Sequence, residues 1–166
     1  SISGRGQEIW MGTLGGASML KYSDDKATFV NYGVATGLTS QYVYSVYAAK
    51  DEVWLGTDGS GLINYKNGKF KTIVDNGYLD NIYSVTGSGN EIWFSSGQGY
   101  LNVLVGDSII SYPIKYNDRE TEISTLVMVD DDHVFFLCEN GIGMFSKQNH
   151  QYVIFNEEYG LEPFNY

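Results

Sequence analysis

Short apolar runs alternate with polar, glycine-containing turns along the whole chain. The clearest example joins four such runs: YVYSVYA at residues 42–48, EVWLGT at 52–57, LINY at 62–65 and FKTIV at 70–74. Asn67-Gly68, between the last two runs, is a strong signal for a tight hairpin turn. Strand-forming residues bounded by turn residues at this spacing are typical of antiparallel strands. We therefore expect a four-stranded antiparallel meander here.

The central run of this unit recurs at regular intervals. EVWLGT at Glu52 is preceded by EIWMGT at Glu8 and followed by EIWFSS at Glu91. A more divergent fourth copy, HVFFLC, begins at His133. In chain order the four copies are 44, 39 and 42 residues apart. No run with a helical period separates the units. A repeat of this length suits one four-stranded propeller blade.

The predicted fold is therefore all-β, with about four four-stranded antiparallel β-propeller blades in a single segment over residues 1–166. Each blade must bury both faces against its neighbours, which explains why the runs after Glu8 and Glu52 are continuously apolar. We expect Trp10, Trp54 and Trp93 to pack between blades. Ser1-Ile2 falls in register with Ser45-Val46, so the unit is a partial propeller, a four-bladed ring or half of a dimeric ring.

The repeats resemble the two-component regulator propeller repeat. The second copy matches best, with Val53-Trp54-Leu55-Gly56-Thr57 followed by Gly61-Leu62 and Tyr65. The fourth copy departs most, with Phe135 in place of Trp and Leu137 in place of Gly. The resemblance implies the periplasmic or otherwise extracytoplasmic sensor region of a hybrid two-component histidine kinase and response regulator protein of the Bacteroidetes type. Many such sensors respond to oligosaccharides.

The net charge limits the kinds of partner, and the cysteine count limits the disulfides. Twenty Asp and Glu against ten Lys and Arg give a net charge of −10, which disfavours nucleic acid and direct contact with an anionic membrane. No apolar run approaches the length of a bilayer span. The single Cys138 excludes an intrachain disulfide, and we expect it to be a small buried hydrophobic residue.

The sequence offers little support for catalysis or metal binding. We expect His133 and His150 in solvated turns on the bottom face. The run at residues 130–132 lacks the spacing of a calcium loop, and no Cys and His set fits zinc. Neither a metal nor a cofactor is therefore predicted. A glycosidase would need two carboxylates at a defined separation, and none of the top-face carboxylates stands out among Asp58, Asp75, Asp80, Asp118, Glu120, Glu122, Glu157, Glu158 and Glu162.

A binding role needs only aromatic faces with amides and carboxylates. In a propeller, the turns between second and third strands share one face, here named the top face, with the blade-to-blade connections. Its candidate ligand-binding residues are Gln41, Tyr42, Asp58, Tyr78, Asn81, Tyr100, Tyr116, Phe164 and Asn165. We therefore predict a non-catalytic sensor segment that binds an oligosaccharide or a partner domain. A structural or protein-interaction module is the alternative, and a propeller-type lyase or glycan-active enzyme is a weaker one.

Overall fold

The computed structural model describes residues 1–74 and 77–162. Its fold is all-β, as predicted, with four four-stranded antiparallel sheets and one two-stranded hairpin. In every four-stranded sheet the strands pair in sequence order, so each sheet is one meander. The four sheets are the four predicted blades.

The first two blades contain the two repeats with the Gly-Thr ending. The first blade consists of β1 (Ile2–Arg5), β2 (Glu8–Thr13), β3 (Gly16–Ser23) and β4 (Lys26–Tyr32). The second consists of β5 (Val43–Ala48), β6 (Val53–Thr57), β7 (Leu62–Lys66) and β8 (Lys69–Val74). Short 3₁₀ turns, η1 (Val34–Thr36) and η2 (Gly77–Leu79), lie in the connections that follow.

The other two blades are joined by a longer connection. The third blade consists of β9 (Ile82–Ser88), β10 (Glu91–Ser96), β11 (Tyr100–Val105) and β12 (Ser108–Pro113), with η3 (Gly97–Gly99) in its top turn. The fourth consists of β15 (Ile123–Met128), β16 (His133–Cys138), β17 (Gly141–Ser146) and β18 (Gln151–Phe155), and η4 (Glu157–Tyr159) follows it.

The connection between the third and fourth blades differs from the sequence expectation. It holds an extra hairpin, β13 (Lys115–Tyr116) paired with β14 (Arg119–Glu120). Asn117 and Asp118 form its two-residue turn with φ of 50° and 63°, the left-handed conformation that a type I′ hairpin turn requires. Asn and Asp tolerate that conformation best among non-glycine residues, so Asn-Asp was a readable turn signal.

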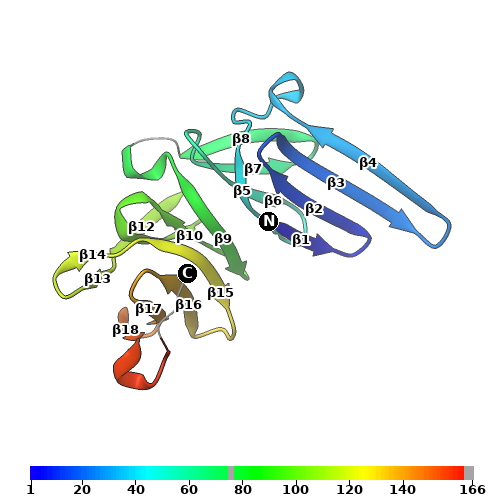
Figure 1. The fold of residues 1–166 in the computed structure, drawn as a ribbon. Helices are drawn as coiled ribbons and strands as arrows, with labels where there is room; N and C mark the ends of the chain where they lie inside the picture. The colour runs from blue at the N-terminus through cyan, green and yellow to red at the C-terminus, as the bar shows by residue number, and fades with distance from the viewer. Residues whose placement is uncertain (75–76, 163–166) are drawn as a thin grey trace.

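The blades lie side by side in an arc, with the first strands β1, β5, β9 and β15 toward its inside and the fourth strands toward its outer edge (Figure 1). One hydrogen bond repeats at each blade junction. A backbone N–H of the later blade donates to a serine Oγ of the earlier one: Val46 to Ser1 at 3.1 Å, Val85 to Ser45 at 2.9 Å and Leu126 to Ser84 at 2.9 Å.

Three apolar clusters fill the blade junctions, and each contains one of the repeated tryptophans. Trp10, Trp54 and Trp93 are 0%, 6% and 3% exposed, which confirms their predicted packing role. Close approach also needs small residues on the second strand. A Cβ added at Gly56 would lie 2.8 Å from both Cγ2 and the carbonyl oxygen of Ile82 in the next blade. The Gly in the repeat is therefore required by packing.

Candidate functional site

The top face is assembled by hydrogen bonds between turns and connections. Gly61 N–H donates to the carbonyl of Asp80 at 2.8 Å, and Ile114 N–H donates to the carbonyl of Gly99 at 2.8 Å. These bonds place the second-to-third strand turns beside the blade-to-blade connections, as the propeller topology predicts. Backbone N–H and C=O groups that are hydrogen-bonded in this way hold irregular segments in fixed positions.

Two tyrosines lie together at the inner edge of this face. Tyr44 in β5 and Tyr83 in β9 occupy the same repeat position, directly before the junction serines Ser45 and Ser84. Their ring centroids are 6.0 Å apart with an interplanar angle of 31°. Tyr44 is 37% exposed and Tyr83 is half-buried. The two rings therefore present aromatic surface to solvent from fixed backbone positions.

Carboxylates flank the two rings. Tyr44 Oη donates to Asp58 Oδ2 at 3.0 Å, and this hydrogen bond, with partial burial, raises the pKa of Tyr44 above its usual value. Burial, then the charges of Glu122 and Asp58, raise the pKa of Tyr83. We name the set Tyr42, Tyr44, Asp58, Tyr83 and Glu122 the axial tyrosine cluster.

A shallow hollow extends this cluster toward the fourth blade. It has a volume of about 280 Å³ and is lined by Tyr83, Glu122, Ile123 and Ser124. Tyr42, at one end of the cluster, is 46% exposed. The cluster therefore brings together two predicted residues, Tyr42 and Asp58, with two tyrosines that the sequence did not single out.

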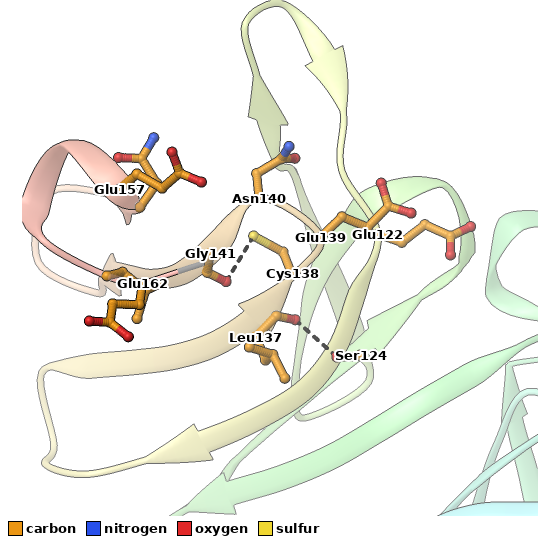
Figure 2. A pocket seen from close by; sticks show the side chains of 11 residues that line it. Glu122, Ser124, Leu137, Cys138, Glu139, Asn140, Gly141, Glu157 and Glu162 are labelled. Carbon is orange, nitrogen blue, oxygen red and sulfur yellow. Dashed lines mark hydrogen bonds between the residues drawn. The ribbon is translucent and has the colours of Figure 1, made fainter. Parts of the chain in front are cut away.

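A larger pocket of about 530 Å³ lies on the fourth blade (Figure 2). Glu122 and Glu139 lie on one side of it and Glu157 and Glu162 on the other. Its floor includes Leu137, Cys138 and Gly141. We name it the acidic pocket; none of the nine predicted ligand-binding residues lines it within the described part of the chain.

The remaining predicted residues lie in different surroundings. Asn81 Oδ1 accepts from Gly59 N–H at 2.9 Å, and Tyr116 Oη accepts from Asn156 Nδ2 at 2.8 Å. Both side chains thus fasten a connection to a blade. Gln41 is exposed and Tyr100, the first residue of β11, is half-buried. The side chain of Tyr78 and the residues Phe164 and Asn165 lie outside what the structure describes.

The two histidines lie at the bottom face, as predicted, but only His150 lies in a turn; His133 is half-buried and begins β16. Lys147 N–H donates to the carbonyl of Asp132, which brings the turn before β16 and the turn before β18 together. His133 Nδ1 lies 3.0 Å from Asp130 Oδ1, and this contact, with the backbone N–H of Asp132, lowers the pKa of Asp130. Over residues 1–74 and 77–162, no three His, Cys, Asp or Glu side chains are grouped to hold a metal ion.

The burial of Cys138 agrees with the sequence expectation. Cys138 is buried, 7% exposed, and its Sγ donates to the carbonyl of Gly141 at 3.4 Å. In the part of the chain that the structure describes, no helix has the length and apolar character needed to cross a membrane.

Comparison with solved structures identifies similar folds. The chain is similar to the extracellular domain of BT4673 of B. thetaiotaomicron, described as a hybrid two-component system, with TM-score 0.74 and 19% identity over 92% of this chain and 21% of that one. The corresponding domain of BT3049, described in the same way and from the same organism, gives TM-score 0.73 and 14% identity over 95% and 22%. The GH74 enzyme of Niastella koreensis gives TM-score 0.66 and 13% identity over 92% and 29%.

These likenesses establish the propeller fold. The chain spans about a fifth of the two extracellular domains that it matches. No protein-family profile matches the sequence, and no curated protein matches it. The fold alone does not fix the function, because one fold serves many activities.

Proposed function

We propose that this chain is a non-catalytic, ligand-binding propeller segment of an extracytoplasmic sensor in a hybrid two-component system, with an oligosaccharide as its ligand. Its structural neighbours BT4673 and BT3049 are extracellular domains of proteins described as such systems. The repeat resemblance described above points the same way. The ligand would act by favouring one arrangement of the sensor over another.

The axial tyrosine cluster is the observation that carries the proposal. Tyr44 and Tyr83 expose neighbouring ring faces from two rigid inner strands. Sugar rings stack on such aromatic surfaces through their apolar C–H faces, while hydroxyls and carboxylates at the edge accept and donate hydrogen bonds. Asp58 and Glu122 supply acceptors at the two ends of the pair.

The charge around the cluster indicates which saccharides fit. Asp58 and Glu122 flank the rings, and Glu139, Glu157 and Glu162 surround the neighbouring acidic pocket. A uronate or sulfated oligosaccharide would bring like charge into this field. We therefore propose a neutral or amine-bearing oligosaccharide.

The proposal is tested by measuring binding to a panel of oligosaccharides by calorimetry, together with the shift in melting temperature. The panel holds neutral β-glucan and xyloglucan fragments, chitosan oligosaccharides and oligogalacturonates. We expect saturable binding to a neutral or amine-bearing member and none to oligogalacturonates. Tightest binding to oligogalacturonates, or the same affinity after Tyr44→Ala and Tyr83→Ala together, would overturn the proposal.

The GH74 neighbour makes an enzyme the second candidate to consider. Glycoside hydrolysis in most families needs two carboxyl groups across the bond, one of them with a raised pKa so that it can donate a proton. The carboxyls of Glu91 and Asp130 instead have lowered pKa values; Glu91 begins β10 and Asp130 lies in the turn before β16, both at the bottom face. Release of new reducing ends from the bound oligosaccharide would favour the enzyme over the sensor.

A further inference from the structure

Three of the first strands interrupt their pairing with the second strand at the same place in the repeat. In β5 the pairing passes from Val43 to Ser45 and skips Tyr44. In β9 it skips Tyr83, and in β15 it skips Ser124. An extra, unpaired residue of this kind is a β-bulge, which bends the strand and redirects a side chain. The second, third and fourth blades therefore each present one redirected side chain at this position.

The fourth blade differs from the other two in the size of this side chain. Between the second and third blades, the bulge residues Tyr44 and Tyr83 place their ring centroids 6.0 Å apart. Between the third and fourth blades, Tyr83 and the much smaller Ser124 line the hollow of about 280 Å³ instead. Both junctions join adjacent blades of the described chain, so they can be compared directly. The hollow takes the place of a third aromatic ring.

The lining of the hollow is aromatic on one side and polar on the other. Tyr83 borders both the ring pair and the hollow. Glu122 and Ser124 contribute a carboxylate and a hydroxyl, and both residues are exposed. Ser124 Oγ donates to the carbonyl of Leu137 at 3.3 Å, which leaves its lone pairs able to accept from a ligand. Ile123, between them, is completely buried and anchors this part of β15 in the core.

A sugar ring matches this lining better than an apolar group does. Its C–H face can lie against the ring of Tyr83, while hydroxyls at its rim donate to the carboxylate of Glu122 and the hydroxyl of Ser124. An apolar side chain of a partner protein would instead cover the carboxylate without offering it a donor, which costs free energy. The negative charge of Glu122 also favours a hydroxyl or an amine over a carboxylate or sulfate.

We propose that the hollow holds one sugar ring of the oligosaccharide, next to the rings that contact Tyr44 and Tyr83, and that Ser124 is the residue that admits it. This inference rests on the proposed function and adds a third ring position to the site. The three positions follow one another along the inside of the arc, from β5 through β9 to β15 (Figure 1). A larger side chain at position 124 would occupy the third position and shorten the site.

Calorimetry with the disaccharide and the trisaccharide of β-1,4-glucan and of chitosan tests this inference. The wild-type chain is expected to bind the trisaccharide of at least one series about tenfold more tightly than the disaccharide, because the third ring adds an aromatic contact and hydrogen bonds. Ser124→Leu and Ser124→Tyr are each expected to remove this difference, since either side chain fills the hollow. The leucine variant does so without offering a new flat ring on which a sugar could stack.

Two further variants separate the hollow from general effects of substitution. Ser108→Tyr makes the same change at an exposed serine that begins β12, far from the hollow in the repeat, and should keep the preference for the trisaccharide. Glu122→Gln keeps the size of a hollow-lining side chain and removes its charge. It should weaken binding of the trisaccharide more than binding of the disaccharide.

The outcomes distinguish this inference from the proposed function. Equal affinities of the wild-type chain for the two lengths, or a preference for the trisaccharide that persists in Ser124→Leu, would overturn the inference and leave the proposed function standing. Failure of every saccharide in the panel and in both series to bind would overturn both. Circular dichroism and the melting temperature of each variant verify that it is folded.

Discussion

Ser45 Oγ accepts a hydrogen bond from the backbone N–H of Val85 in the next blade at 2.9 Å, and both groups are buried. A side chain of one blade thereby accepts a hydrogen bond from a backbone N–H of the next blade. The pairing within the sheet leaves this N–H without a partner. A buried donor without a partner costs more than the bond itself contributes. The serine therefore sets both the distance and the register between neighbouring blades.

Ser45→Ala is expected to lower the free energy of unfolding by about 1–3 kcal/mol, because the N–H of Val85 would be buried without an acceptor. Urea denaturation followed by tryptophan fluorescence measures the change. Ser18→Ala is the matched control, since Ser18 Oγ bonds the exposed Asn31 side chain, and it should shift stability by less than about 0.5 kcal/mol. Equal effects of the two variants would contradict the structural role assigned to Ser45.

Gly56→Ala is expected to destabilise the chain by about 1–3 kcal/mol through overpacking. The added Cβ would lie 2.8 Å from the Ile82 carbonyl oxygen, and a backbone atom cannot move aside as a flexible side chain can. At Gly15 the nearest atom to an added Cβ is Thr13 Oγ1 at 3.8 Å, so Gly15→Ala should be close to neutral. Comparable urea midpoints for the two variants would show that the blades are not packed as closely as described.

The lowered pKa of Glu91 predicts that its contribution to the free energy of unfolding depends on pH. Burial would raise its pKa, but hydrogen bonds from Lys147 Nζ at 2.7 Å and Trp93 Nε1 at 3.0 Å outweigh burial and lower it. A folded-state pKa below the unfolded value means that the stabilisation is present above the unfolded pKa, about 4.3, and is lost as pH falls through the folded pKa.

Glu91→Gln should therefore reduce the free energy of unfolding by about 1 kcal/mol at pH 7 and by progressively less below about pH 4. Denaturation curves of both proteins at a series of pH values measure this difference. Glu120→Gln, at an exposed position of the β13–β14 hairpin, serves as the control. A difference between Glu91→Gln and wild type that stays constant down to pH 3 would refute the assignment.

The axial tyrosine cluster predicts that ring surface matters more than hydroxyl groups for saccharide binding. Tyr83→Phe should keep affinity within about threefold, whereas Tyr83→Ala should weaken it by about tenfold or more, since an aromatic contact is worth on the order of 1 kcal/mol or above. Calorimetry with the tightest-binding member of the panel gives both values. Tyr22→Ala, at an exposed tyrosine of β3, should leave binding unchanged, and a loss there would point to a different surface.

The fold could be predicted from the sequence because the same pattern of strands and turns occurs in each repeat. The four strands expected around Glu52 agree with β5 to β8 to within one residue at each end. Periodicity could not reveal Tyr44 and Tyr83 as neighbours, because their contact depends on a register shift between Val43 and Ser45 and on the packing of β5 against β9. The candidate ligand-binding residues of the sequence lie mainly in loops, whereas the exposed rings belong to strands.

Asn81 and Tyr116 are the opposite case: predicted ligand contacts whose side chains make structural hydrogen bonds. Both had the residue type and the loop position of ligand contacts, yet their polar atoms are bonded to Gly59 and Asn156. Whether a polar side chain faces a ligand or fastens its own loop is decided by three-dimensional neighbours. Composition at one position carries no information about that choice.

The main packing between blades in this molecule joins each blade to its immediate neighbours in sequence. Such an assembly behaves as a one-dimensional array, in which stability is a sum of unit terms and nearest-neighbour couplings. The outermost units have one coupling each and the inner ones two. Amide protons should consequently exchange fastest in the two outer meanders and slowest in β6 and β10, so the chain frays from its ends while the centre that carries Tyr44 and Tyr83 is the last part to open.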